Sequence, residues 1–275
     1  MNGSIGGNGL SEEEEGYRRN RKKILSLVML AGEIMLSNGA ETYRIEETMR
    51  RMAESYGLRS IEAFVTPTGI FATIGYSENE TSTMVKRVKI RTIHLEKVAN
   101  VNDLSREMFE GKVGIDCAYK KLLEINKIMP YSRISTALSI TISCFCFSYM
   151  FGGVWADCFN SAIAAFMLSQ FIYFANRRNF SRVLVNLFGG ALVSMSALVV
   201  INLGIGVNID MAVIGAIMPL VPGVALTNAI RDILEGDFLS GSTRIVDALI
   251  VAICIAAGVG SAYHLWVSIF GGLIL

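Results

Sequence analysis

The sequence predicts a polytopic α-helical membrane protein with about five transmembrane helices and an N-terminal α+β domain. The first observation is that 52% of the 275 residues are apolar. The second is the distribution of charge: residues 1–130 hold 37 of the 49 Lys, Arg, Asp and Glu, and residues 131–275 hold 12. The third is a series of apolar runs confined to the second part. That part lacks the polar surface to face water, so we expect it to face lipid.

The N-terminal part begins with a Gly/Asn-rich and then acidic stretch, residues 1–16, which we expect to be a disordered tail. Residues 17–130 are expected to form the α+β domain. A helix is predicted from about Tyr17 to Ser37, because Asn38-Gly39 tolerates the left-handed conformation that ends helices. A second helix is predicted over about 40–56, with an apolar face at helical spacing.

β-Prone segments come next, at 60–66, 69–76 and 83–92. Pro67-Thr68 and a polar turn at 77–80 divide them, which predicts an antiparallel meander with helices on one face. Two further helices are predicted at 95–109 and 115–127.

Five runs in residues 131–275 are long enough to span the roughly 30 Å hydrocarbon core, which takes about 20 helical residues. They are 134–151, 155–175, 183–203, 211–230 and 245–270. The connections after the second and fourth runs carry arginines, and those near 152–154 and 204–210 carry none. Basic loops face the cytoplasm, so we expect a multi-pass protein of the cell membrane with a cytoplasmic N-terminal domain and an external C-terminus.

The fourth run is interrupted by Pro219, Pro222 and Gly223. Prolines donate no backbone N–H, and lipid cannot satisfy the carbonyls left over, so this backbone is expected to face protein or a wet cavity. A half-helix starting at Pro222-Gly223 would aim free N–H groups at a substrate carboxylate. A simple proline kink is the alternative reading.

Polar residues follow the break. Asn228, Arg231 and Asp232 share one helix face and are candidates for a gate at the cytoplasmic mouth, or else form a solvated helix end. Gly236-Asp237 and Ser240-Gly241 are expected to make a short loop. Asp247, one turn inside the fifth run, is a candidate for proton coupling, with pairing to Arg244 as the alternative.

In the N-terminal domain the candidates are Glu33, Glu41 and Arg44, around the predicted helical hairpin. Glu33 is notable because it interrupts an apolar run. The chain has no Gly-rich phosphate loop, nucleophile elbow or CxxC pair, so we expect no enzyme, no catalytic residue, no metal and no cofactor. The balanced charge of residues 1–130 gives no footprint for nucleic acid.

Two sets of motifs together resemble the threonine/serine exporter family. One runs from Pro219 through Gly223 and 228–232 to Ser240-Gly241, and the other comprises Asn38–Glu46 with 65–70. Full-length members resemble this chain followed by a second, shorter membrane domain, which in split members is a separate small protein. The resemblance implies the larger subunit of a split exporter, with a small integral membrane partner in a hetero- or homo-oligomer.

The resemblance also implies a small carboxylate-bearing substrate: a hydroxy amino acid such as threonine or serine, or a dicarboxylate such as succinate. Two other readings stay open. One is a membrane-anchored enzyme or sensor whose cytoplasmic domain is the active part, and the other is a purely structural assembly subunit.

Overall fold

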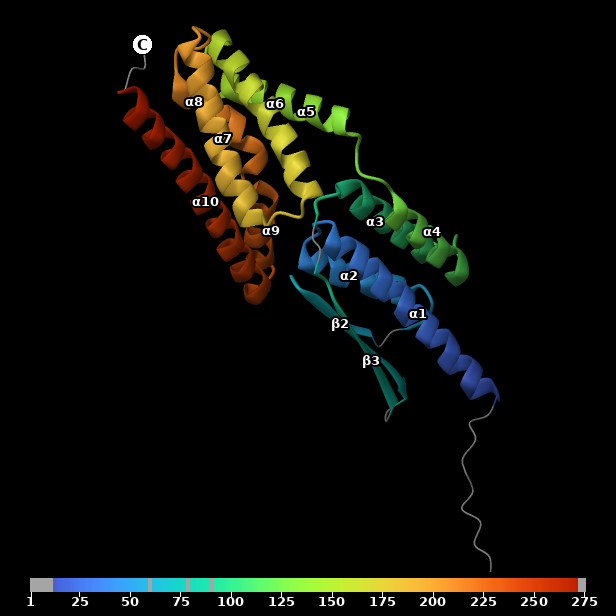
Figure 1. Cartoon of the computed structure of the whole chain (residues 1–275). Helices are drawn as coiled ribbons and strands as arrows, with labels where there is room; N and C mark the ends of the chain where they lie inside the picture. The colour runs from blue at the N-terminus through green and yellow to red at the C-terminus, as the bar shows by residue number, and fades with distance from the viewer. Residues whose placement is uncertain (1–11, 59–60, 78–79, 90–91, 272–275) are drawn as a thin grey trace, which may run out of the picture. The chain divides into compact units, whose positions relative to one another are not determined.

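The structure is a computed structural model that describes residues 12–58, 61–77, 80–89 and 92–271. The chain forms two compact units (Figure 1). The first comprises residues 1–129 together with Thr227–Arg244, and the second comprises Pro130–Leu226 with Ile245–Leu275. One boundary between the two units lies at Pro130. The return of residues 227–244 to the N-terminal unit had no signal in the composition.

The first unit contains two central helices, three strands and two outer helices. They are α1 (Glu12–Ser37), α2 (Thr42–Glu54), β1 (Ile61–Thr66), β2 (Gly69–Ser77), β3 (Glu80–Arg87), α3 (Leu95–Phe109) and α4 (Ile115–Lys127). The predictions for α3 and α4 match to the residue. α1 begins at Glu12, so the expected tail is helical from there on, and its remainder, residues 1–11, lies outside the described residues.

The strands form an antiparallel sheet in the order β1-β2-β3, which confirms the predicted meander. The third strand was predicted too late, at 83–92. It starts at Glu80 because Ser77 and Glu80 are directly paired, so the hairpin is tighter than the polar run suggested. Ile61, Val65 and Ile70 point inward, and Phe64 and Phe71 lie opposite each other on the outer face.

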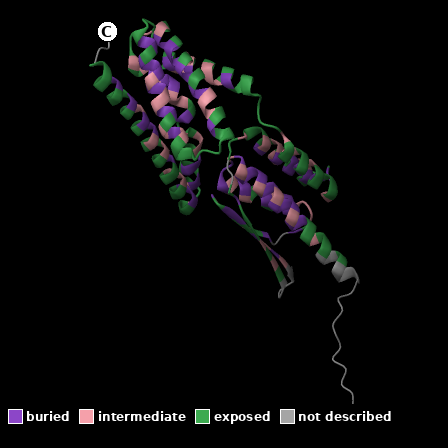
Figure 2. Ribbon diagram, viewed as in Figure 1, coloured by how far each residue is buried: buried purple, intermediate pink, exposed green. Residues whose placement is uncertain are grey.

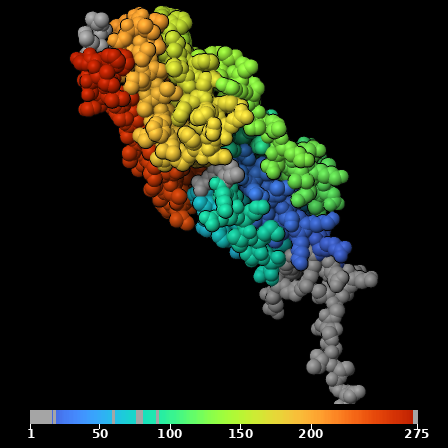
Figure 3. Space-filling view, viewed as in Figure 1, coloured from blue at the N-terminus to red at the C-terminus, as the bar shows by residue number. Residues whose placement is uncertain are grey.

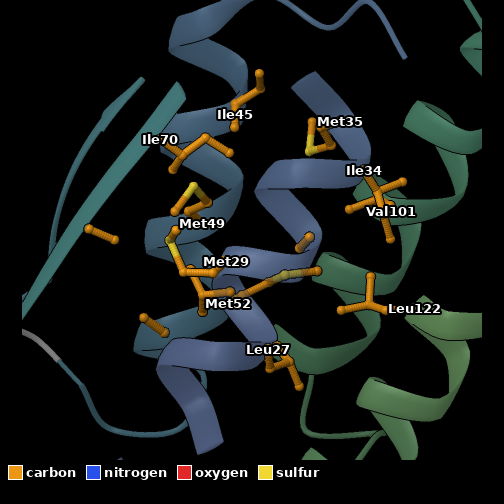
Figure 4. Packing of buried hydrophobic residues seen from close by; sticks show 14 of the residues in the cluster. Leu27, Met29, Ile34, Met35, Ile45, Met49, Met52, Ile70, Val101 and Leu122 are labelled. Atoms are coloured by element: carbon orange, nitrogen blue, oxygen red, sulfur yellow. The ribbon is translucent and has the colours of Figure 1, made fainter. Parts of the chain in front are cut away.

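The core of this unit lies on both sides of α1 and α2. Figure 4 shows Ile45, Met49 and Ile70 meeting on the sheet side of these helices, and Val101 and Leu122 reaching them from α3 and α4. Burying each large apolar side chain contributes about 1.5–3 kcal/mol. The two central helices are thereby covered on one side by the sheet and on the other by α3 and α4.

Asn38-Gly39 ends α1 as predicted. Gly39 has a φ of +92°, and the Ala40 N–H donates to the Met35 carbonyl over 3.1 Å. This closure turns the chain straight into α2 and fixes the backbone of residues 39–42.

The second unit is a helical bundle, and its helices follow the predicted runs closely. They are α5 (Arg133–Met150), α6 (Trp155–Arg177), α7 (Arg182–Asn202), α8 (Ile209–Ile217) with the 3-10 turn η1 (Met218–Leu220), the start of α9 (Gly223–Leu234) and most of α10 (Phe238–Phe270). The remainder of α9 and the first residues of α10 lie in the segment Thr227–Arg244 of the first unit. In the space-filling view, the yellow atoms of α6 and α7 and the orange atoms of α8 form a continuous surface (Figure 3).

Small residues fill the bundle core, among them Ala164, Ala197 and Ala216. Figure 2 shows the buried residues in purple. Glycines bring α7 and α10 together: a Cβ on Gly258 would stand 2.0 Å from the Leu187 carbonyl oxygen, and one on Gly190 would stand 2.8 Å from that of Ile255. Backbone contact this close requires glycine, in keeping with the small-residue packing of membrane helices.

Three helices in the described part of the chain, α6, α7 and α10, are long and apolar enough to cross a membrane. The bent pair formed by 209–220 and α9 makes a fourth if it counts as one span. α5 occupies the place of the first expected run, and its crossing, and with it the count of five, stays a prediction.

One expected loop is wrong. Ser240 and Gly241 lie inside α10, which begins at Phe238 because the Asp237 carboxylate accepts the Ser240 N–H over 3.1 Å. Gly241 serves close packing, since a Cβ there would stand 2.8 Å from the Ala229 carbonyl oxygen of α9. The first turn of α10 therefore rests directly on α9.

Candidate functional site

The broken fourth run is present in the structure. α8 passes into the 3-10 turn Met218–Leu220, Val221 is extended, and α9 starts at Gly223 after a bend of 63°. Because Pro222 has no N–H, the Met218 carbonyl accepts instead from Val221, over 3.2 Å. The half-helix thus begins where the two prolines and the glycine predicted.

At the break, one side chain is buried in the bundle and its neighbours are exposed. Leu220 is buried, and Gly189 leaves room for it: a Cβ on Gly189 would stand 3.1 Å from a Leu220 methyl group. Pro219 and Gly223 are exposed. The break therefore presents backbone on an accessible face of the unit, where an apolar span would present side chains.

Nine residues along α9, about 14 Å by the rise of a helix, Asp232 enters a buried contact with the N-terminal residues. One carboxylate oxygen accepts from the Thr42 N–H over 3.2 Å and from the Thr42 hydroxyl over 2.7 Å. The other oxygen lies 3.0 Å from the Arg244 Nε, although that N–H is not aligned with it as a hydrogen bond. The Asp232 side chain has 0% exposure and that of Arg244 12%.

Three more contacts join the same segments. Asn228 donates to the Gly39 carbonyl over 2.9 Å, Arg244 donates to the Ala40 carbonyl over 3.1 Å, and Arg231 pairs with Glu41. We call Glu41, Thr42, Asn228, Arg231, Asp232 and Arg244 the polar cluster. It joins the two motif regions that the sequence sets far apart.

Every charge of the polar cluster has a partner of opposite sign within the described residues. Glu41 also lies 3.4 Å from Arg44, so it holds two guanidinium groups. A ligand carboxylate would compete with Glu41 or Asp232 for an arginine, and a ligand ammonium would compete with an arginine for a carboxylate. Opening a buried pair is expensive, about 3–5 kcal/mol when one partner is removed. A ligand that supplies the missing charge would offset this cost, so one ion pair within the cluster could be exchanged for one with the ligand.

The structure brings together Asn228, Arg231 and Asp232 with Glu41 and Arg44, five of the residues singled out in the sequence. It leaves two apart. Glu33 pairs with Lys86 over 3.2 Å between α1 and β3. Asp247 is exposed, and the arginine considered as its partner, Arg244, contacts Asp232.

The described residues contain no group of three or more His, Cys, Asp or Glu that could hold a metal ion. The organisation of the site is instead that of a helix break followed by paired charges, and the sequence matches a known family. Over residues 26–266 it fits the family described as "Putative threonine/serine exporter".

The chain belongs to the threonine/serine exporter family. The resemblance drawn from the motifs is confirmed, and it places the chain among membrane transporters.

The chain is similar to several named bacterial proteins. It is 23% identical over 240 residues to the "Probable threonine/serine exporter" of Mycobacterium tuberculosis, covering 86% of this chain and 45% of that relative. It is 22% identical over 249 residues to the "Probable succinate transporter subunit YjjP" of Escherichia coli, covering 90% of this chain and 96% of the relative. The chain therefore spans less than half of the first relative and nearly all of the second. No solved structure matches it.

Two members of the polar cluster were missed in the sequence. Thr42 stands next to Glu41 in the N-terminal motif, but its hydroxyl is an ordinary helix-start residue until Asp232, 190 positions away, is placed against it. In the sequence, Arg244 was considered only as a topology marker and as a partner of Asp247. Its distance of twelve residues from Asp232 is not a helical repeat, because the chain turns between α9 and α10.

Proposed function

We propose that the chain is the larger subunit of a secondary exporter of small carboxylate-bearing metabolites, either threonine/serine-type amino acids or a dicarboxylate such as succinate. The observation that carries the proposal is the break at Pro219–Gly223, which leads directly into the polar cluster. The N-terminus of α9 offers the positive end of the helix dipole to a carboxylate. An anchoring helix would gain nothing from such a break.

In this proposal Pro219, Pro222 and Gly223 form the substrate site, and Asn228, Arg231 and Asp232 form the cytoplasmic entrance. The substrate exchanges ion-pair partners with Glu41 and Asp232 as it enters. The N-terminal unit is cytoplasmic and the C-terminus external, with five spans. Fusions of a reporter active on only one side of the membrane, placed at 152–154 and at 178–180, test this topology.

The partner in this proposal is a small integral membrane subunit. Two observations support it: relatives of nearly the same extent are named transporter subunits, and the mycobacterial relative is about twice as long as the matched region. Co-purification of this chain with the small membrane protein, followed by transport assays with each alone and both together, tests the assignment.

The helix break is tested in proteoliposomes. The double variant Pro219→Ala/Pro222→Ala restores an unbroken helix and is expected to abolish efflux of labelled threonine or succinate. Pro67→Ala/Pro130→Ala, which alters the two prolines outside the predicted spans, is the control. Wild-type rates in the Pro219→Ala/Pro222→Ala variant would rule out the break as the substrate site.

Asp247 is the proposed proton carrier, since it is an ionisable residue within a span. Asp247→Asn is expected to abolish uphill export driven by a pH gradient while exchange of substrate across the membrane continues. Uphill export at the wild-type rate would exclude Asp247 from coupling.

A further inference from the structure

A cavity of about 470 Å³ lies on the N-terminal unit where α2 meets the free edge of β1. Its charged lining comes from Glu46 and Arg50 of α2 and from Glu62 of β1, and its apolar wall includes Phe64 and Phe71. None of these residues belongs to the polar cluster. The cavity thus combines both signs of charge with an aromatic surface, all from one compact unit.

Two charged side chains of this cavity form no close ion pair with the described residues. On the same helix, Arg51 pairs with Glu47, whereas Arg50 forms no hydrogen bond or ion pair with any described residue and acts on Glu46, one turn before it, only through its charge. Glu62 likewise has none. Arg50 on α2 and Glu62 on β1 can therefore each receive a ligand group of opposite charge.

Glu46 is half-buried at the base of the cavity. One of its oxygens accepts the Val65 N–H over 2.8 Å, which shows that this N–H faces the free edge of β1. Alternation along the strand places the Ala63 N–H on the same edge. Burial raises the pKa of the Glu46 carboxyl, and the charges of Asp237 and Asp232 raise it further against the opposing effects of Val65 and Arg50. A positive ligand group beside Glu46 would relieve this cost.

The aromatic wall is exposed. Phe64 is 53% and Phe71 43% exposed, and their ring centroids lie 6.2 Å apart. An ammonium group over such a ring gains cation–π attraction, and an apolar side chain gains burial. The wall therefore suits an organic ligand better than a bare ion.

We infer that this cavity binds a small zwitterion of the α-amino acid class, with its ammonium group between Glu46 and Glu62 and its carboxylate on Arg50. The carbon skeleton lies against Phe64 and Phe71. The site is distinct from the helix break, and its assignment does not depend on the proposed transport function.

The site is also positioned to influence the polar cluster. Thr42, Glu46 and Arg50 follow one another at intervals of four residues, so they line one face of α2. Thr42 donates two hydrogen bonds to Asp232, and the charge of Asp232 acts on Glu46. A ligand on Glu46 and Arg50 therefore sits one turn from the contact that holds α9. This regulatory role, unlike the binding itself, rests on the proposed function: the ligand would report the cytoplasmic amino acid level to the exporter.

Calorimetric titration of the purified full-length chain tests the inference. The probes are L-leucine, L-threonine and L-glutamine, together with two leucine analogues that each lack one charge, 3-methylbutylamine and 4-methylpentanoate. At least one amino acid is expected to bind saturably, and each leucine analogue to bind at least roughly tenfold more weakly than leucine, or not at all. No binding by any of the three amino acids up to about 10 mM, well above a millimolar Kd, would overturn the inference.

Variants locate the binding. Arg50→Gln and Glu62→Gln change exposed side chains and are expected to fold and to weaken binding about tenfold or more. Arg51→Gln, its neighbour outside the cavity, is expected to bind as the wild type does. Unchanged binding in Arg50→Gln and Glu62→Gln would overturn the inference, and loss of that binding in Pro219→Ala/Pro222→Ala would move the ligand to the helix break. Because the titration measures no transport, a negative result leaves the proposed function standing.

Discussion

Replacing Asp232 by Asn removes one negative charge from a fully buried position without changing the shape of the side chain. Asn retains an oxygen for the two Thr42 donors, but as a neutral acceptor each bond falls from about 1.5–3 to about 1 kcal/mol. Arg244, 12% exposed and 3.0 Å from the carboxylate, loses its counter-charge, which for a buried pair costs about 3–5 kcal/mol. Part of this is recovered because Arg244 also donates to the Ala40 carbonyl. We expect a net destabilisation of about 3 kcal/mol.

The assay is thermal unfolding of the purified chain in detergent. About 3 kcal/mol corresponds to a fall in Tm of roughly 6–12 °C for a unit of this size. Asp237→Asn is the control, because Asp237 caps α10 and Asn caps a helix equally well. The double variant Asp232→Asn/Arg244→Gln should recover part of the loss, since it leaves no unpaired charge. A Tm for Asp232→Asn no lower than that of Asp237→Asn would refute the view that this carboxylate ties α9 to the N-terminal residues.

Two further predictions concern packing and pH. Gly258→Ala would force a Cβ to within 2.0 Å of the Leu187 carbonyl oxygen and should cost about 1–3 kcal/mol or more by separating α7 from α10. Gly260→Ala, which meets nothing within 4 Å, should express and unfold as the wild type does, and equal stability of the two variants would contradict the close contact. Because burial raises the pKa of Glu46 above its ordinary 4.5, the carboxyl contributes stability that is present below pH 4.5 and is lost as the pH rises through the raised pKa. Glu46→Gln should therefore raise the Tm relative to the wild type at pH 8 but not at pH 4, and a gap of the same size at both pH values would contradict this linkage.

Most of the helices were predicted because neighbouring residues in the sequence determine where they begin and end. α3 and α4 have a clear apolar face and glycines between them, so both were placed to the residue. The α8–α9 break was foreseen because proline chemistry acts on its own neighbours. The prediction failed at Ser240-Gly241, where two residues typical of turns lie in a helix. There the deciding factor is the Ala229 carbonyl on another helix, which leaves no room for a side chain.

The polar cluster could be predicted only in part, for a related reason. Helical spacing places Asn228, Arg231 and Asp232 on one face, and it groups Glu41 with Arg44 on another helix. No local pattern predicts that these two helices are in contact. The cavity beside Glu46 was not foreseen at all. It depends on β1 being an edge strand, which follows from the strand order and not from the composition of the strand.

The docking of residues 227–244 on the N-terminal unit has a consequence for biogenesis. Thr42 leaves the ribosome 190 residues ahead of its partner Asp232, a delay of about 10–40 s at typical rates of synthesis. In the proposed topology, α5 to α8 are inserted during this interval, while the start of α2 waits in the cytosol without its partner Asp232. That topology makes membrane insertion and maturation of the N-terminal unit interdependent. A nascent chain stopped before Thr227 is expected to be more sensitive to protease around residues 39–42 than one continued past Arg244, so an insertion failure would be detectable by the cell's quality control from the aqueous side.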